Sequence, residues 1–384
     1  MKRALPNMGV AVISIASFAA LGYLLLAVEQ QWAVAAVALA AIIVLAAAGR
    51  LGTLRTLEAT HASRSSQVNT LVVVATLALM ALFHGDHFAL LMLVKVMLFC
   101  IACLGLNVQF GYAGVVNFAG AAFFGMGAYA TAVLAQHTAI PHLVILLLGG
   151  AMAALAGTVL TLPMLRTRGH YAALITIAFG ILFKTFLEVN DLLGGPQGLK
   201  LPGLRVAGYA FNDNIAYGQT GEISFYVNYA LLALVILVVA FALVKRLERS
   251  WIGLYLDAVR IDETAASVFG VGVGRSKVLA FAFGNFFAGL AGSLYAMMTG
   301  FIAPADFTFS DSLILVSIVI LGGLGNPWSI IPAAALVIVL PEKLQVIQEY
   351  RILLFSVLVV LILRFRPDGL IPRRLRVFVS GKTA

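Results

Sequence analysis

Long apolar runs separated by short basic clusters are the feature that most constrains the fold of this chain. Each run carries almost no charge, and most have close to the roughly 20 residues that an α-helix needs to cross a bilayer, although 68–83 is shorter. Because lipid satisfies no backbone hydrogen bond, these runs are predicted to be helices of an all-α polytopic membrane protein. They cover residues 8–28, 32–49, 68–83, 88–106, 114–135, 143–165, 171–187, 225–244, 278–305 and 312–341, and a last run ends at 363.

Composition excludes the soluble classes of protein. The 384 residues are 62% hydrophobic and 11% charged, whereas a soluble domain has about 25% charged residues. A cytosolic enzyme, a nucleic-acid-binding domain and a disordered chain are therefore excluded. The net charge of +9 comes from basic clusters between the apolar runs, so it predicts membrane orientation rather than a nucleic-acid partner.

The basic clusters also predict the topology. With the N-terminus in the cytoplasm, alternating spans bring most of the 25 Lys and Arg residues to the inner side. The run 312–341 would be about 45 Å long as one helix against a hydrocarbon core of about 30 Å. It is interrupted at 322–327, so we expect it to turn back. The prediction is about 11–12 transmembrane or re-entrant helices, with both termini cytoplasmic.

Four segments follow from this map. Residues 1–64 form a two-helix N-terminal extension and residues 65–372 the main transmembrane domain, within which 245–277 is a large cytoplasmic loop. Residues 373–384 form a basic cytoplasmic tail. The outer excursion 190–224 is rich in Gly, Pro and Asn, which predicts a folded surface loop. Its candidate functional residues are Gly194, Gly195, Pro196 and Gly198.

No catalytic set is recognisable. The histidines are scattered, and the sequence 84–87 (HGDH) is interpreted as a tight outer turn rather than a metal site. Residues 270–277 resemble a phosphate-binding loop but lack its Gly-Lys-Ser/Thr ending. Cys100 and Cys103 lie within an apolar run and are predicted to pack as inert thiols. We therefore expect no catalytic residue, no metal ligand and no cofactor in this chain.

Charged residues inside the spans indicate whether a transport protein could be driven by an ion gradient. Ion-driven carriers usually need carboxylates within the membrane, whereas the acidic residues here fall in loops or at span ends, with Glu188 closest to the bilayer. Lys95 and Lys184 lie within spans. Each either contacts a neighbouring helix or interface, or takes a direct part in solute movement, and the sequence leaves both alternatives open.

Two interrupted segments predict the solute path. Residues 105–114 and 322–327 break the apolar pattern with glycines, amides and a proline. Paired breaks of this kind expose backbone groups and helix ends to a polar solute, although ordinary turns between helices would share the pattern. The predicted pathway residues are Asn107, Gln109, Gly111, Tyr112, Gly114, Asn117, Gly322, Gly323, Gly325 and Asn326.

The inner loop contains a candidate contact for another protein. Residues 257–269 are predicted to form one short helix outside the bilayer that ends at Gly270. Small residues at 264–266 would allow close approach of a partner, although any cytoplasmic connector can contain such a helix. The candidate coupling residues are Arg260, Asp262, Glu263, Ala265, Ala266 and Gly270.

The order of these motifs resembles the branched-chain amino-acid permease family of the LivM type. The matching stretches are GLN and GYxG within 105–114, AFFGxGAY at 122–129, LRxRGxY at 165–171, GGPxG at 194–198, AVRIDExAA at 258–266, AGxAGxLY at 288–295, GGxGN at 322–326 and RPDGL at 366–370. Residues 117–120 (NFAG) depart from the Ser-Leu-Gly-His common in that family. The first 64 residues lie outside the resemblance.

The resemblance implies one membrane subunit of an ATP-binding-cassette (ABC) importer for branched-chain or other hydrophobic amino acids in a bacterial inner or plasma membrane. Its implied partners are a paralogous permease, two ATPases that bind ATP and Mg²⁺, and a periplasmic or lipid-anchored binding protein. The alternatives are a permease for urea or short amides and an ion-coupled secondary carrier. An intramembrane enzyme would need a catalytic pair that the sequence lacks.

Overall fold

The computed structural model describes residues 8–28, 65–167, 171–206, 208–217 and 221–343, with isolated positions at 30, 33, 36, 350, 353, 357, 364 and 369. Apart from those positions, the predicted spans at 32–49 and before 363, and the tail 373–384, lie outside the described residues.

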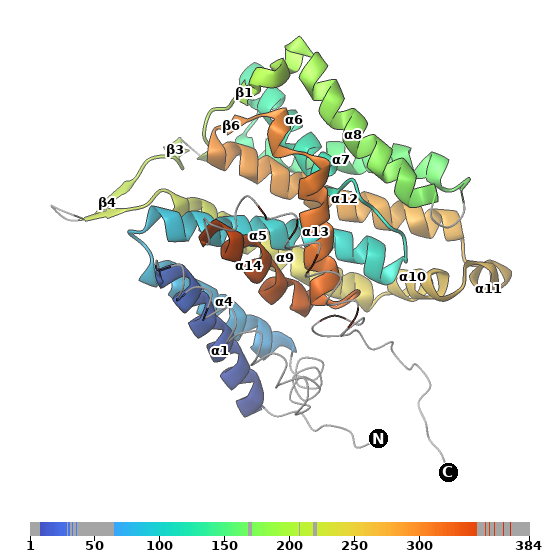
Figure 1. Cartoon of the computed structure of the whole chain (residues 1–384), viewed down its shortest axis with the longest axis horizontal. Coiled ribbons are helices and arrows are strands. Elements are labelled where there is room, and N and C mark those ends of the chain that lie inside the picture. Colours follow the sequence, from blue (N-terminus) through green and yellow to red (C-terminus); the bar gives the residue numbers. More distant parts are fainter. Residues whose placement is uncertain are drawn as a thin grey trace.

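The described chain is a helical bundle (Figure 1). Its long helices are α1 (Met8–Ala27), α4 (Ser65–Leu82), α5 (His87–Asn107), α6 (Gly120–His137), α7 (His142–Met164), α8 (Tyr171–Val189), α9 (Tyr226–Glu248), α12 (Val273–Thr299), α13 (Phe309–Gly322) and α14 (Ile330–Lys343). Among the described residues, six helical segments are long and apolar enough to cross a membrane. The predicted all-α polytopic fold is confirmed.

Helix α12 forms the centre of the bundle and packs against α5, α6 and α7. The contacts are so close that a β-carbon added at Gly105 would clash with the Gly284 carbonyl. A β-carbon at Gly127 would clash in the same way with the backbone of Gly289, and one at Gly292 with the carbonyl of Phe124. Small residues therefore bring these helix backbones into direct contact, as they do in tightly packed membrane helices.

The long apolar run near the C-terminus is broken where the glycines predict. Helix α13 ends at Gly322, a short 3₁₀ turn η5 (Pro327–Ser329) follows, and α14 then begins. Gly323 and Gly325 have left-handed φ values of 114° and 85°, which an L side chain rarely adopts. The Lys343 ammonium at the end of α14 donates to the Leu26 carbonyl at 2.7 Å, so the end of α14 lies against the end of α1.

A polar excursion lies at one end of the bundle and two short helices lie at the other (Figure 1). The excursion contains 3₁₀ turns η2 (Asp191–Leu193) and η3 (Gly195–Gln197) and strands β1 (Leu199–Lys200), β2 (Arg205–Val206), β3 (Tyr209–Ala210), β4 (Ile215–Tyr217) and β5 (Gly221–Ile223). Strands β2–β3 and β4–β5 pair as antiparallel hairpins. At the opposite end lie α10 (Trp251–Ile261) and α11 (Glu263–Val268).

Strand β1 connects this excursion to the segment after α12. It pairs antiparallel with β6 (Phe301–Ile302), with Leu199 opposite Ile302. A 3₁₀ turn η4 (Pro304–Asp306) follows β6 and leads into α13. The excursion is therefore folded onto the bundle, as predicted for 190–224. We call this end of the bundle the loop end and the opposite one the α10 end.

Candidate functional site

The two interrupted segments predicted from the sequence lie in direct contact. After α5 the chain forms a π turn, η1 (Val108–Tyr112), and the Gly325 amide donates to the Asn107 Oδ1 at 2.7 Å. A β-carbon on Gly111 would clash with the Gly325 backbone. The two interrupted segments thus form one junction, which we call the break junction (residues 107–114 and 322–326).

Three buried amides lie beside this junction. Gln109 donates from Nε2 to Asn285 Oδ1 at 2.9 Å. Asn117 donates from Nδ2 to Gln109 Oε1 at 2.8 Å and to Asn285 Oδ1 at 3.2 Å. All three side chains are fully buried. Because a buried polar group without a partner is costly, this network holds η1, the segment before α6 and α12 in one arrangement.

The remaining predicted pathway residues are packed around the same junction. Tyr112 is fully buried, Gly322 packs against the Ser329 carbonyl, and Asn326 accepts a hydrogen bond from the Trp328 amide at 3.1 Å. Gly114 has a left-handed φ of 67°. The structure therefore brings together all ten predicted residues, but none of them lines the cavity described next.

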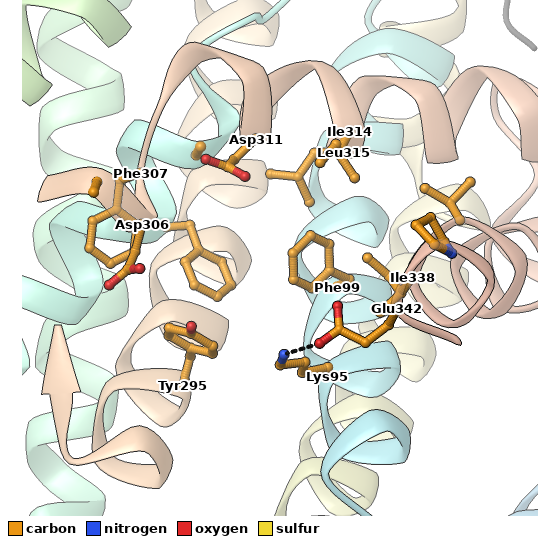
Figure 2. A pocket seen from close by; sticks show the side chains of 15 residues that line it. Lys95, Phe99, Tyr295, Asp306, Phe307, Asp311, Ile314, Leu315, Ile338 and Glu342 are labelled. Atoms are coloured by element: carbon orange, nitrogen blue, oxygen red, sulfur yellow. Dashed lines mark ion pairs between the residues drawn. The ribbon is translucent and has the colours of Figure 1, made fainter. Parts of the chain in front are cut away.

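A cavity of about 260 Å³ lies between α5, α6, α12, α13 and α14. The Lys95 ammonium on α5 and the Glu342 carboxylate on α14 form an ion pair at 3.7 Å on one wall (Figure 2). Tyr295 and Asp306 lie across the cavity from this pair. Its lining residues are Lys95, Phe99, Ala121, Phe124, Tyr295, Ala305, Asp306, Phe307, Asp311, Ile314, Leu315, Val337, Ile338, Pro341 and Glu342.

The two aspartates of the cavity hold the local backbone. Asp306 accepts a hydrogen bond from the Ala303 amide at 2.9 Å. Asp311 accepts from the amide of Thr308 at 3.0 Å and from its hydroxyl at 2.5 Å, which forms the capping box of α13. Both carboxylates are therefore engaged in shaping the segment between α12 and α13.

The outer-loop glycines pack beside this segment. Gly194, Gly195 and Gly198 have φ values of 80°, 50° and 74°. A β-carbon on Gly198 would also clash with the Ile302 carbonyl. These glycines therefore let the 3₁₀ turn that contains Pro196 fold tightly against β6 and η4, next to the cavity wall.

At the α10 end, the prediction of one helix over 257–269 is wrong. Two helices meet at Asp262, whose φ of −157° and ψ of 111° are extended. Its Oδ1 accepts from the amides of Thr264 and Ala265 at 2.8 and 3.0 Å. Because an aspartate at an N-cap satisfies the free amides of a helix start, Asp262 ends α10 and begins α11.

Of the small residues expected to face a partner, Thr264 and Ala265 are exposed and Ala266 is buried. Ala266 is only 5% exposed because it packs within this chain, whereas Val268 is 79% exposed and Phe269 85%. Ile261 and Trp251 are exposed as well. We call these four exposed apolar residues, two on α10, one on α11 and one directly after it, the α10–α11 patch. Gly270 follows it with a left-handed φ of 81° and open space around it.

Two charged residues of this loop connect it to the rest of the molecule. The Arg260 guanidinium donates to the Gly111 carbonyl in the break junction, and the Arg260 stem lies against Gly114. Glu263 on α11 forms a 2.6 Å ion pair with Lys277 on α12. The candidate coupling loop therefore contacts both the break junction and the central helix.

Sequence reasoning missed Asn285 and the pairing of Lys95 with Glu342. Asn285 is an isolated amide within the apolar run of α12, and that isolation is the signal that could have marked it. Glu342 was interpreted as a residue at a span end. Its position opposite Lys95 depends on the return of α14 along α5, which only the folded chain shows.

Comparisons with known proteins agree with this architecture. The family model described as "Branched-chain amino acid transport system / permease component" matches residues 88–363. Proteins named "High-affinity branched-chain amino acid transport system permease protein LivM" from Escherichia coli K12 and Salmonella typhimurium LT2 are each 35% identical over 289 residues. These matches cover 72% of this chain and 68% of each relative.

A third relative comes from an archaeon. The "Probable branched-chain amino acid transport permease protein LivM" of Methanocaldococcus jannaschii is 27% identical over 327 residues, which cover 72% of this chain and 91% of the relative. No solved structure matches the chain significantly. With a family model that spans α5 to the last apolar run, the chain belongs to the branched-chain amino acid permease family.

Proposed function

We propose that this protein is a membrane-spanning subunit of an ABC importer that moves branched-chain or other hydrophobic amino acids into the cytoplasm. Family membership and the names of the relatives support the substrate class. The observation that carries the mechanism is the hydrogen bond from Arg260 to Gly111. It joins a loop at the α10 end directly to the break junction. A movement of that loop would therefore also move the backbone at the helix breaks.

The proposal requires partner subunits. ATP and Mg²⁺ would be bound by two ATPases, a second paralogous permease would complete the membrane part, and a periplasmic or lipid-anchored binding protein would deliver the solute. In this chain the glycine-rich stretch 270–272 connects α11 to α12. The following Lys277 pairs with Glu263, so this lysine is engaged within the loop rather than presented to a nucleotide.

The proposed orientation puts the α10 end in the cytoplasm of a bacterial cell with the protein in its inner or plasma membrane. Charge distribution supports it, because the basic residues of the large loop and its flanking helix ends gather at the α10 end. They are Lys245, Arg246, Arg249, Arg260, Arg275 and Lys277. An excess of Lys and Arg favours the cytoplasmic side, and the chain termini would lie on the same side.

The α10–α11 patch is the proposed ATPase contact. Phe269 and Val268 expose large apolar side chains outside the span region, which is unfavourable unless a partner covers them. Arg260, Asp262 and Glu263 are used within this chain, for the contact with Gly111, the α11 cap and the ion pair with Lys277. An ATPase that moves the patch would therefore move α10, α11 and the break junction together.

The test is reconstitution of the whole importer. The chain, a second permease and two ATPases are placed together in proteoliposomes. The binding protein is added on the side of the membrane opposite the ATPases, and uptake of labelled L-leucine is measured with ATP on the ATPase side. We expect uptake that needs ATP and stops with a hydrolysis-deficient ATPase. Uptake driven by an ion gradient without ATP would contradict the proposal, as would uptake of urea in place of leucine.

A further inference from the structure

Two opposite charges lie within the membrane-spanning part of the cavity. Lys95 is about 12 Å along α5 from its first residue, His87, and its side chain is 26% exposed; that of Glu342 is 31% exposed. A charge at this depth is costly unless it faces a polar cavity and a partner. The 3.7 Å separation is also longer than the roughly 2.7–2.9 Å of a closed charge-assisted hydrogen bond.

The neighbouring charges of the cavity are engaged elsewhere. Asp306 and Asp311 accept backbone and hydroxyl hydrogen bonds from Ala303 and Thr308. Lys343, next to Glu342, donates to the Leu26 carbonyl and lies 5.1 Å from the centre of the Phe88 ring. These contacts leave Lys95 and Glu342 as the cation and anion that both line the cavity and face one another.

An amino acid has its ammonium and carboxylate on the same carbon, so it needs a cation and an anion side by side. Lys95 and Glu342 provide this pair from adjacent helices (Figure 2). When an amino acid binds, the ion pair between Lys95 and Glu342 would be replaced by two ion pairs, one between each residue and the solute. The charges in the cavity would stay balanced. Urea carries no ionic group, so it would form hydrogen bonds with Lys95 and Glu342 but no ion pair.

Apolar side chains form the wall next to the charged pair. Phe99, Ile314, Leu315 and Ile338 lie on the same side of the cavity as Lys95 and Glu342 (Figure 2). The cavity volume of about 260 Å³ is just below the range of ligand pockets for drug-sized molecules, roughly 300–1,000 Å³. A cavity of this size and lining suits one small solute with an aliphatic side chain.

From these observations we propose that the cavity binds a zwitterionic amino acid with a branched aliphatic side chain. Lys95 takes its carboxylate, Glu342 takes its ammonium, and the wall formed by Phe99, Ile314 and Ile338 takes its side chain. The inference rests on the proposed importer function and adds where the chain holds its solute. In the proposed orientation, this site faces the outer half of the membrane.

The experiment measures binding separately from transport. Ala305 lines the cavity and is exposed, so Ala305→Cys is a reporter for maleimide labelling in the assembled complex. The native Cys100 and Cys103 are buried and give little background. Asp213→Cys in the polar excursion is also exposed and is the reference reporter outside the cavity.

We expect L-leucine to protect Ala305→Cys from labelling but to leave Asp213→Cys unchanged. The amine 3-methylbutylamine lacks the carboxylate and 4-methylpentanoate lacks the ammonium, so each should protect only at concentrations at least about tenfold higher. Lys95→Met and Glu342→Gln should shift the leucine concentration for half protection by a similar factor. The Lys184–Glu188 pair on α8, at 3.1 Å, provides the matched controls Lys184→Met and Glu188→Gln, which should change nothing.

A double variant separates solute binding from a structural ion pair. If the pair only stabilised the fold, the double variant Lys95→Met with Glu342→Met would regain the leucine protection that either single variant loses. The reason is that removal of both charges is tolerated better than removal of one. We expect the double variant to assemble normally and still fail to be protected by leucine. Protection equal to the parent reporter in the double variant would overturn the site.

The outcomes also distinguish the site from the proposed function. A complex that imports leucine with ATP but shows no leucine protection of Ala305→Cys refutes the site and leaves the function standing. Protection by leucine in a complex that imports no leucine supports the site and refutes the function. Protection by urea in place of leucine refutes the assignment of the ligand.

Discussion

The guanidinium of Arg260 at the end of α10 donates to the carbonyl of Gly111 in the π turn after α5. Gly111 in turn packs against the backbone of Gly325. Two contacts therefore lead from the loop at the α10 end through the first helix break to the second. The first contact joins a side chain to the Gly111 carbonyl, and the second joins the backbones of Gly111 and Gly325.

Loss of this hydrogen bond should uncouple the loop from the break junction. Arg260→Met keeps an unbranched stem against Gly114 but removes the donor to Gly111. Since a hydrogen bond to a charged group contributes about 1.5–3 kcal/mol, we expect uptake per ATP hydrolysed to fall at least about fivefold. The measurement is coupled uptake and ATPase activity in proteoliposomes. Arg275→Met, an exposed arginine at the same end, is the control and should behave like the parent protein.

Close packing at the break junction should tolerate no added carbon. A β-carbon in Gly111→Ala would clash with the Gly325 backbone, whereas Gly180→Ala on α8 meets its nearest atom at 3.9 Å. Because overpacking costs about 1–3 kcal/mol, we expect Gly111→Ala to lower the melting temperature of the purified complex and its uptake. Gly180→Ala should leave both unchanged. Equal melting temperatures for the two variants would show that the junction can relax.

The Asn107 side chain should stabilise the second helix break. Asn107→Leu removes the acceptor for the buried Gly325 amide, and an unsatisfied buried amide costs about 1–3 kcal/mol. We expect lower uptake and a lower melting temperature, with assembly intact. Thermal unfolding and leucine uptake of the same preparation provide the check. Asn228→Leu on α9 is the control and should spare uptake, because the Asn228 side-chain amide donates to Tyr209 and Phe211 in the polar excursion.

The α10–α11 patch should be the ATPase contact. Phe269 is 85% exposed, so Phe269→Ser alters no packing within this chain. We expect weaker ATPase co-purification and less uptake while membrane insertion stays normal. Leu192→Ser, 90% exposed at the loop end, is the matched control. Unchanged ATPase association in Phe269→Ser would exclude this patch as the contact.

The proposed orientation is testable with two cysteines. Asp213→Cys in the polar excursion and Ser267→Cys on α11 are both exposed. In intact cells a membrane-impermeant maleimide should label position 213 at once and position 267 only after permeabilisation. The reverse pattern would invert the map.

The helices and the interruption after α13 were predictable because hydrophobic run length and glycine position are local properties of the sequence. The end of α10 was harder to predict. Residues 257–269 contain no glycine or proline, and the break appears because the Asp262 side chain bonds the following amides. An aspartate at this position is an N-cap signal, and the prediction of one helix ending at Gly270 did not use it.

The candidate sites depend on contacts between distant parts of the chain. Asn107 and Gln109 stand out as amides in a glycine-rich break. Their partners are distant in sequence: Gly325 lies beyond α13 and Asn285 lies on α12. Lys95 and Glu342 meet only because α14 returns along α5. No spacing or periodicity in the sequence reports that return path, so the pair could not be predicted.

The glycine contacts between α12 and its neighbours also restrict how this subunit can change shape. Gly105 against Gly284, Gly127 against Gly289 and Gly292 against Phe124 leave no room between these backbones. Sliding or rotation of α12 past α5 or α6 would drive main-chain atoms into each other, and packed membrane helices resist such strain. Helices α5, α6 and α12 therefore form one rigid unit. A transport cycle has to tilt them together, and the hinge residues have to lie outside these three helices.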